Sequence, residues 1–142
     1  MKQNILRIAI VALVGVLAAS CGINEPTQID ENNLYGAWQE DGTHHYVRFL
    51  DETDGGLTYK YGREWDEDDD IYESDLKYHG NGWFKWELVQ TNLTEIHLMD
   101  NGGAEIPKTY IVTKLTETEL QYYEKDHKEI KTSFTKVVEK KN

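Results

Sequence analysis

From Leu34 onward, short runs of alternating apolar and polar residues are separated by turn residues. The clearest run covers residues 57–65, where a period of two is typical of a half-buried β-strand. One of its faces carries Leu57, Tyr59, Tyr61 and Trp65. The other carries Thr58, Lys60 and Glu64. We expect the aromatic face to point into the core and the polar face to meet solvent.

The same pattern predicts about eight strands. They fall at residues 34–39, 46–50, 57–65, 83–89, 93–99, 108–115, 119–123 and 132–138. Clusters of Asp, Asn and Gly at 51–56, 80–82 and 100–103 predict turns. No segment has a sustained helical period, and the short connections favour antiparallel neighbours. We therefore expect an all-β domain, either a sandwich or an up-and-down barrel of about eight antiparallel strands, with the barrel favoured because closure removes exposed edges.

The N-terminal residues have a different pattern. Lys2 and Arg7 precede an apolar run at residues 8–19, which is the layout of a secretory signal. The run is too short to cross a bilayer core of about 30 Å as a helix. Residues 1–20 are therefore predicted to be a signal peptide and not part of the fold.

Cys21 is the only cysteine in the chain and follows this run directly. The sequence Leu-Ala-Ala-Ser-Cys at residues 17–21 resembles the bacterial lipobox, in which small residues precede an acylated cysteine. The resemblance implies a lipoprotein signal peptide, lipid attachment at Cys21 and a place in the cell envelope, with the outer membrane expected. The alternative is an ordinary signal peptide that leaves a free thiol. Residues 21–33 are polar and aperiodic, and they predict a flexible tether before a domain at residues 34–142.

The mature chain is strongly acidic. Removing residues 1–20 takes away Lys2 and Arg7 and no acidic residue, which leaves 13 basic and 26 acidic residues and a net charge of −13. Such a charge argues against nucleic acid and against direct docking on anionic lipid, because both need basic patches.

The first predicted strand contains Gly36, Ala37 and Trp38, which resemble the Gly-x-Trp signature of lipocalins. The chain is similar over residues 34–138 to the small lipocalin-like lipoproteins of Bacteroides-type bacteria. That resemblance implies a barrel whose floor is closed where Lys136 of the last strand packs over Trp38. It also implies an interior that can hold a small apolar molecule.

The aromatic residues expected inside the barrel are the candidate ligand pocket. They are Tyr59, Tyr61, Trp65, Phe84, Trp86 and Tyr122. An eight-stranded barrel is either just filled by its side chains or holds one small ligand. Plain core packing by these rings therefore remains the alternative.

Metal and catalytic motifs are weak. Asp66, Asp68 and Asp70 have the first spacings of a calcium loop, but Ile71 and Lys77 stand where such a loop needs Gly and Glu. We interpret this segment as a solvated acidic loop. The five histidines lack zinc-ligand spacing, and no nucleophile elbow, phosphate loop or zinc-protease motif occurs, so neither a cofactor nor an enzyme is expected.

Two functions remain open. The leading hypothesis is a membrane-anchored, lipocalin-like lipoprotein that binds a small apolar or amphipathic molecule. The alternative is a non-enzymatic structural or protein-interaction component of the envelope with a filled barrel.

Overall fold

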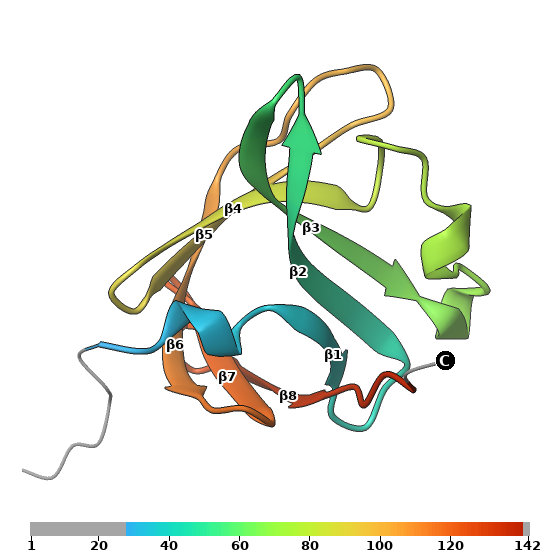
Figure 1. Cartoon of the computed structure of the whole chain (residues 1–142). Coiled ribbons are helices and arrows are strands. Elements are labelled where there is room, and N and C mark those ends of the chain that lie inside the picture. The colour runs from blue at the N-terminus through green and yellow to red at the C-terminus, as the bar shows by residue number, and fades with distance from the viewer. Residues whose placement is uncertain (1–27, 141–142) are drawn as a thin grey trace, which may run out of the picture.

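The computed structural model describes residues 28–140, which form one closed barrel of eight antiparallel strands in chain order (Figure 1). The strands are β1 (Gly36–Glu40), β2 (His45–Asp54), β3 (Leu57–Asp66), β4 (Trp83–Val89), β5 (Asn92–His97), β6 (Lys108–Leu115), β7 (Glu119–Glu124) and β8 (Lys131–Lys136). The expected lipocalin-like, up-and-down barrel is confirmed. None of the helical segments between residues 28 and 140 has the length and apolar content that a membrane crossing requires.

The two ends of the barrel differ in their connections. The connections at residues 55–56, 90–91 and 116–118 are short, and up-and-down topology places them at one end, which we call the floor. The longer connections 41–44, 67–82, 98–107 and 125–130 lie at the other end, which we call the mouth. The turn expected at residues 51–56 is shorter than predicted, because β2 continues to Asp54 and only Gly55 and Gly56 make the turn.

The inner core is packed inside the barrel. Its buried members are Leu34, Trp38, Val47, Phe49, Phe84, Trp86, Leu93, Val112, Leu120, Tyr122 and Phe134. Phe84 packs so tightly against β3 that a Cβ added at Gly62 would lie 2.0 Å from its ring. Gly62 is paired with both Phe49 and Phe84, so this glycine marks the inner face of β3.

That register corrects the predicted orientation of β3. Side chains alternate across a strand, so Tyr59, Tyr61 and Trp65 lie on the outer face of the barrel. Tyr61 is buried there against Trp83, with ring centroids 5.8 Å apart, and Trp65 stacks on Tyr46 at 5.3 Å. The expectation that Tyr59, Tyr61 and Trp65 point into the barrel is wrong.

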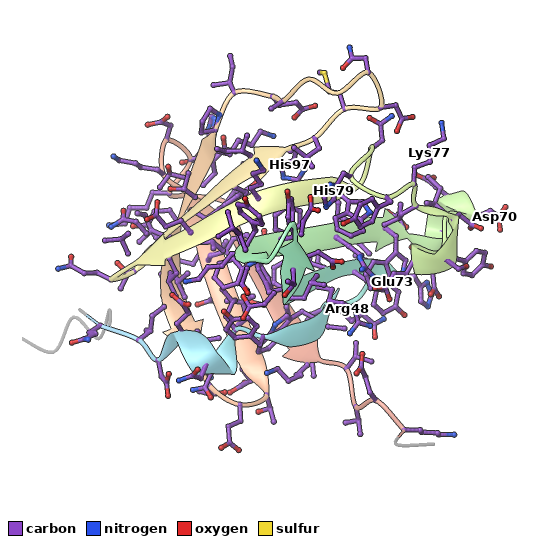
Figure 2. All side chains as sticks on the ribbon, turned by 45° about the horizontal axis from the view of Figure 1, so that its top comes forward. Arg48, Asp70, Glu73, Lys77, His79 and His97 are labelled. Carbon is purple, nitrogen blue, oxygen red and sulfur yellow. The ribbon has the colours of Figure 1, made fainter. Side chains whose placement is uncertain are left out.

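The segment between β3 and β4 explains why outer aromatic residues are buried. It contains two short 3₁₀ helices, η2 (Glu67–Asp69) and η3 (Glu73–Asp75), which lie outside the barrel (Figure 1). Arg48 holds Glu73 through two hydrogen bonds, Nε to Oε1 at 2.7 Å and Nη2 to Oε2 at 3.0 Å. Arg63 donates to the same carboxylate at 3.2 Å, and the labelled pair Arg48 and Glu73 is visible in Figure 2. The acidic segment is therefore anchored to β2 and β3 and not wholly solvated as expected.

The folded part begins before Leu34. Glu31–Asn33 form a 3₁₀ helix, η1, that is capped by the side chain of Asp30, and Ile29 packs against the core. The last residues of the predicted tether are therefore part of the domain. Cys21 and the predicted signal peptide lie outside the described residues.

Candidate binding site

The floor is closed by a contact between the first and last strands. Trp38 is completely buried, its Nε1 donates to the Leu34 carbonyl at 2.8 Å, and it pairs with Lys136. The Nζ of Lys136 lies 4.6 Å from the centroid of the Trp38 ring and donates to the carbonyls of Asn33 and Tyr35. The expected contact between Trp38 and Lys136 is therefore present.

Gly36 begins β1 beside this contact. Its φ of +113° favours glycine, while a Cβ there would make only ordinary contact with the end of Lys136. Burial lowers the pKa of Lys136. The floor thus leaves the opposite end as the place where a ligand can enter.

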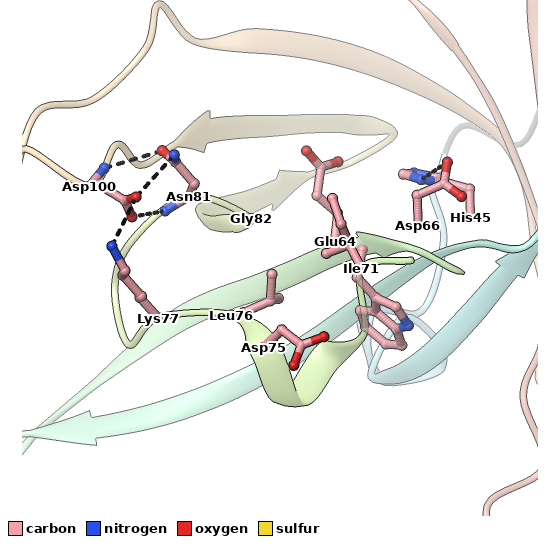
Figure 3. A pocket seen from close by; sticks show the side chains of 11 residues that line it. His45, Glu64, Asp66, Ile71, Asp75, Leu76, Lys77, Asn81, Gly82 and Asp100 are labelled. Carbon is pink, nitrogen blue, oxygen red and sulfur yellow. Dashed lines mark hydrogen bonds and ion pairs between the residues drawn. The ribbon is translucent and has the colours of Figure 1, made fainter. Parts of the chain in front are cut away.

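Two adjoining hollows lie at the mouth. The apolar hollow, of about 370 Å³, is lined by Trp65, Ile71 and Leu76 together with polar residues at its ends, and Figure 3 shows it from close by. The polar hollow, of about 400 Å³, is lined by residues of β3, β5 and β6 and the loops beside them. Glu64, Asn81 and Gly82 line both. Each volume falls within the lower part of the range of small-molecule sites.

The polar hollow contains a histidine held between two carboxylates. Nδ1 of His97 lies 3.3 Å from Glu64 Oε1, and its Nε2 lies 3.2 Å from Glu95 Oε2. Glu64, Glu95 and His97 all point inward, because β5 alternates with the buried Leu93 and Glu64 is paired with Val47. The inward position of Glu64 differs from the solvent face that the sequence pattern predicts for it.

The pKa values of His97, Glu64 and Glu95 depend on their burial and on the charges of one another. Burial alone would lower the pKa of His97, but hydrogen bonds and charges from Glu64 and Glu95 raise it to about 10. Burial would raise the pKa of Glu64, yet His97 brings it below its ordinary value. Burial raises the pKa of Glu95 despite the opposing effect of His97. At neutral pH His97 is therefore a cation, and both of its nitrogens face carboxylates.

Glu95 is the most buried charged residue in the described chain, with 4% of its surface exposed. Its Oε2 faces His97, but its Oε1 has no hydrogen-bond partner among residues 28–140. An unpartnered buried carboxylate oxygen costs free energy. The trio therefore keeps one buried oxygen, Oε1 of Glu95, that can still accept a hydrogen bond.

Tyr110 lines the polar hollow and supplies it with a hydroxyl group, whereas Tyr122 lies in the core. The rings of Tyr110 and Tyr122 lie 4.6 Å apart inside the barrel. Burial raises the pKa of both, and the charges of Glu95 and Glu64 raise them further. Both phenols are thus protonated, and the potential around them is negative.

The predicted pocket residues separate into three groups. Phe84, Trp86 and Tyr122 lie inside as expected, but they belong to the packed core and line neither hollow. Trp65 lines the apolar hollow from the outer face of β3, and Tyr59 and Tyr61 line neither hollow.

The sequence alone does not single out the buried trio or the polar hollow, whose charged and aromatic residues include Glu64, Glu95, His97, Lys108 and Tyr110. The alternation Leu93-x-Glu95-x-His97 could have indicated two of them, had Leu93 been taken as the inward residue.

The weak calcium candidates are used in local contacts. Asp66 accepts from the backbone of Asp68, whose carboxylate lies 2.7 Å from His44 Nδ1, and Asp70 ends η2 in the left-handed region with φ of 58°. Across residues 28–140, no group of three or more His, Asp or Glu side chains is arranged to hold a metal ion.

The ionised histidine and the two hollows limit the chemistry available at the mouth. His97 has both ring nitrogens engaged by carboxylates and a raised pKa, so it is poorly suited to accept a proton from a substrate at neutral pH. The adjoining apolar and polar hollows suit a molecule with an apolar body and a polar head.

Comparison of the chain with protein-family models, curated proteins and solved structures finds no match.

Proposed function

We propose that this chain is a lipid-anchored, lipocalin-like binding protein of the bacterial envelope that holds a small amphipathic molecule at the mouth of its barrel. The observation that carries the proposal is the sharing of Glu64, Asn81 and Gly82 by an apolar and a polar hollow. A bound molecule can place its apolar body against Trp65, Ile71 and Leu76 while its polar head meets charged and hydroxyl groups. Removing the apolar body from water would stabilise the complex by roughly 25 cal/mol per Å² of buried apolar surface.

The proposed site occupies less of the barrel interior than the sequence predicts. Trp38, Phe49, Phe84 and Trp86 are packed inside the barrel, so the space left for a ligand is in the two hollows at the mouth. This arrangement favours a small molecule over a long acyl chain threaded along the barrel axis. The filled floor is also what the alternative function, an envelope interaction protein, would show.

Blocking the apolar hollow tests the proposal. Ile71 is 44% exposed and lines the hollow, so Ile71→Trp should fill the space without disturbing the core. The matched control is Val89→Trp, at an aliphatic residue 55% exposed beside the turn at residues 90–91. The closed barrel is complete within residues 28–140, so the chain from Gly22 onward is used without its lipid.

The screen measures thermal shift and Trp fluorescence with fatty acids, amines, sterols, retinoids, quinones and haem. A ligand at about a hundredfold excess over its dissociation constant should raise the free energy of unfolding by about 2.7 kcal/mol. We expect Ile71→Trp to abolish that gain and Val89→Trp to keep it. Failure of every ligand, or binding that survives Ile71→Trp unchanged, would leave the interaction protein as the better proposal.

The lipid anchor has its own test. Cys21→Ser should abolish labelling by radioactive palmitate in a bacterial host and move the protein out of the membrane fraction, because only the thiol accepts the lipid. Asn24→Ser, three residues later in the predicted tether, should label and fractionate like the unaltered chain. Continued labelling of the Cys21→Ser protein would contradict the anchor.

A further inference from the structure

We infer that the molecule held at the mouth is an organic amine whose protonated nitrogen lies against Glu64 and whose apolar body lies against Trp65, Ile71 and Leu76. This inference rests on the proposed function and adds the chemical class of the ligand. It is carried by the balance of charge around the two hollows, by the position of Glu64 between them, and by the unpartnered oxygen of Glu95.

The two hollows are lined by more carboxylates than cations. The carboxylates are Glu64, Asp66, Asp75, Asp100 and Glu105. The basic residues are Lys77, Lys108, His97 and His45, whose Nδ1 lies 3.8 Å from Asp66. Lys77 already lies 3.4 Å from Asp100, and His97 is engaged by Glu64 and Glu95. Lys108 is the cross-strand partner of Glu95 and lowers the pKa of both Glu64 and Glu95, but its side chain is exposed, so solvent and salt screen its charge.

The buried trio itself has more carboxyl groups than cations. Glu64 and Glu95 face His97, and Glu95 is buried. Lys108, the cross-strand partner of Glu95, adds its charge from an exposed side chain. The Oε1 of Glu95 finds no donor among the described residues. A cation on the mouth side of the trio would offset this excess where the surroundings screen it least.

Glu64 is placed to receive that cation. It lines both hollows, and its side chain keeps 37% of its surface exposed although it is paired with His97. Only its Oε1 makes the contact with His97, which leaves Oε2 to accept from a ligand. In Figure 3, Glu64 is seen among the side chains that line the apolar hollow, with Asn81 and Gly82 to its left. The apolar body of a molecule whose ammonium group lies at Glu64 can extend into the apolar hollow, which Glu64 and Trp65 both line.

An anionic ligand fits these surroundings poorly. Its charge would face Glu64 with Glu95 behind, and the negative potential at Tyr110 and Tyr122 reflects the same carboxylates. The mature chain carries a net charge of −13, which repels anions at a distance and attracts cations. An alcohol would avoid the repulsion but gain no ion pair.

The test compares ligands that share one apolar body. Tryptamine, tryptophol and indole-3-acetate carry an amine, an alcohol and a carboxylate on indole, and octylamine, octanol and octanoate repeat the series on an alkyl chain. Binding to the chain from Gly22 onward is measured by calorimetry at neutral pH. We expect the amine of at least one series to bind about 10- to 100-fold more tightly than its alcohol, the usual gain from a charged hydrogen bond, and the acid not to bind.

Substitution then locates the charge. Glu64→Gln should weaken binding of that amine by about 10- to 100-fold and leave the alcohol unchanged. Glu87→Gln removes the same charge from an exposed residue on the outer face of β4 and should change neither. The comparison among the three head groups uses the unaltered protein, so it stands whether or not the Glu64→Gln protein folds.

The outcomes separate this inference from the proposed function. If the alcohol or acid binds as tightly as the amine and Ile71→Trp abolishes that binding, the site is real and the amine inference is wrong. If the amine binds but Glu64→Gln and Glu87→Gln weaken it equally, the charge attraction is general and the assignment to Glu64 fails. If no molecule of either series binds and the broader screen is also negative, both proposals fail.

Discussion

Trp38→Ala should lower the free energy of unfolding by about 3–5 kcal/mol, the usual cost of removing a large buried aromatic side chain. Trp38 is completely buried where β1 meets β8, and its indole nitrogen satisfies the Leu34 carbonyl at 2.8 Å. Its removal leaves a cavity in the floor and an unpaired carbonyl, and it takes away the ring beneath Lys136. Urea unfolding of the chain from Gly22 onward, followed by circular dichroism, measures the loss.

Two further variants show whether the loss comes from this position. Trp38→Phe keeps much of the apolar volume but loses the indole donor, so we expect a smaller loss than for Trp38→Ala. Val138→Ala, at a residue 90% exposed just after β8, should stay within about 0.5 kcal/mol of the unaltered chain. A loss for Trp38→Ala as small as that of Val138→Ala would contradict the closed floor.

His97→Ala should cost about 3–5 kcal/mol at neutral pH, because removing one partner of a buried ion pair leaves uncompensated charge. Only 16% of the His97 side chain and 5% of the Glu95 side chain are exposed, so water cannot readily replace the lost cation. The matched control is His127→Ala, which removes a histidine 55% exposed whose Nδ1 lies 3.6 Å from Glu129. We expect almost no loss for the control, because exposed ion pairs contribute little.

The pKa of His97 also predicts how the free energy of unfolding changes with pH. The pKa of His97 is raised from 6.5 to about 10 on folding, so its stabilisation is fully present below pH 6.5 and is lost as pH rises through 10. In the His97→Ala protein, burial still raises the pKa of Glu95, and no cation opposes it. Stability of that variant should therefore begin to fall as pH rises above the ordinary carboxyl pKa of 4.5.

Urea unfolding of both proteins at several pH values between about 5 and 9 measures this difference. The cost of His97→Ala should grow from acid to neutral pH, because the carboxylates of the variant lose their protons over that range while His97 of the unaltered chain stays charged. Parallel stability curves for the two proteins would show that His97 is not a buried cation.

The alternation of apolar and polar residues determined the number, order and type of the strands. Each expected strand is present within a few residues of its expected bounds, because a period of two is a local property of the chain. The resemblance to lipocalins also located Trp38 and Lys136, which meet across the closing strands. The tail of the tether was misjudged, since the packing of Ile29 depends on a core that no local pattern reveals.

Only the tertiary structure decided which face of each strand is inside. Alternation distinguishes two faces of β3 but cannot say which is buried when both are covered. Here the outer face is covered by residues 67–82, anchored where Arg48 and Arg63 bind Glu73, so Tyr61 and Trp65 are buried outside the barrel. Gly62 was the available clue, because the ring of Phe84 leaves no space for a side chain on the inner face.

The candidate site belongs entirely to the tertiary structure. Glu64, His97 and Lys108 come from β3, β5 and β6, and no sequence spacing joins them. Separately, each looks like an ordinary polar residue of a solvated strand. Closure of the barrel brings these side chains to one hollow at the mouth. There His97 forms ion pairs with the carboxylates of Glu64 and Glu95. The sequence by itself therefore determined the barrel, whereas the site depends on low dielectric and long-range contact, which exist only once the barrel has closed.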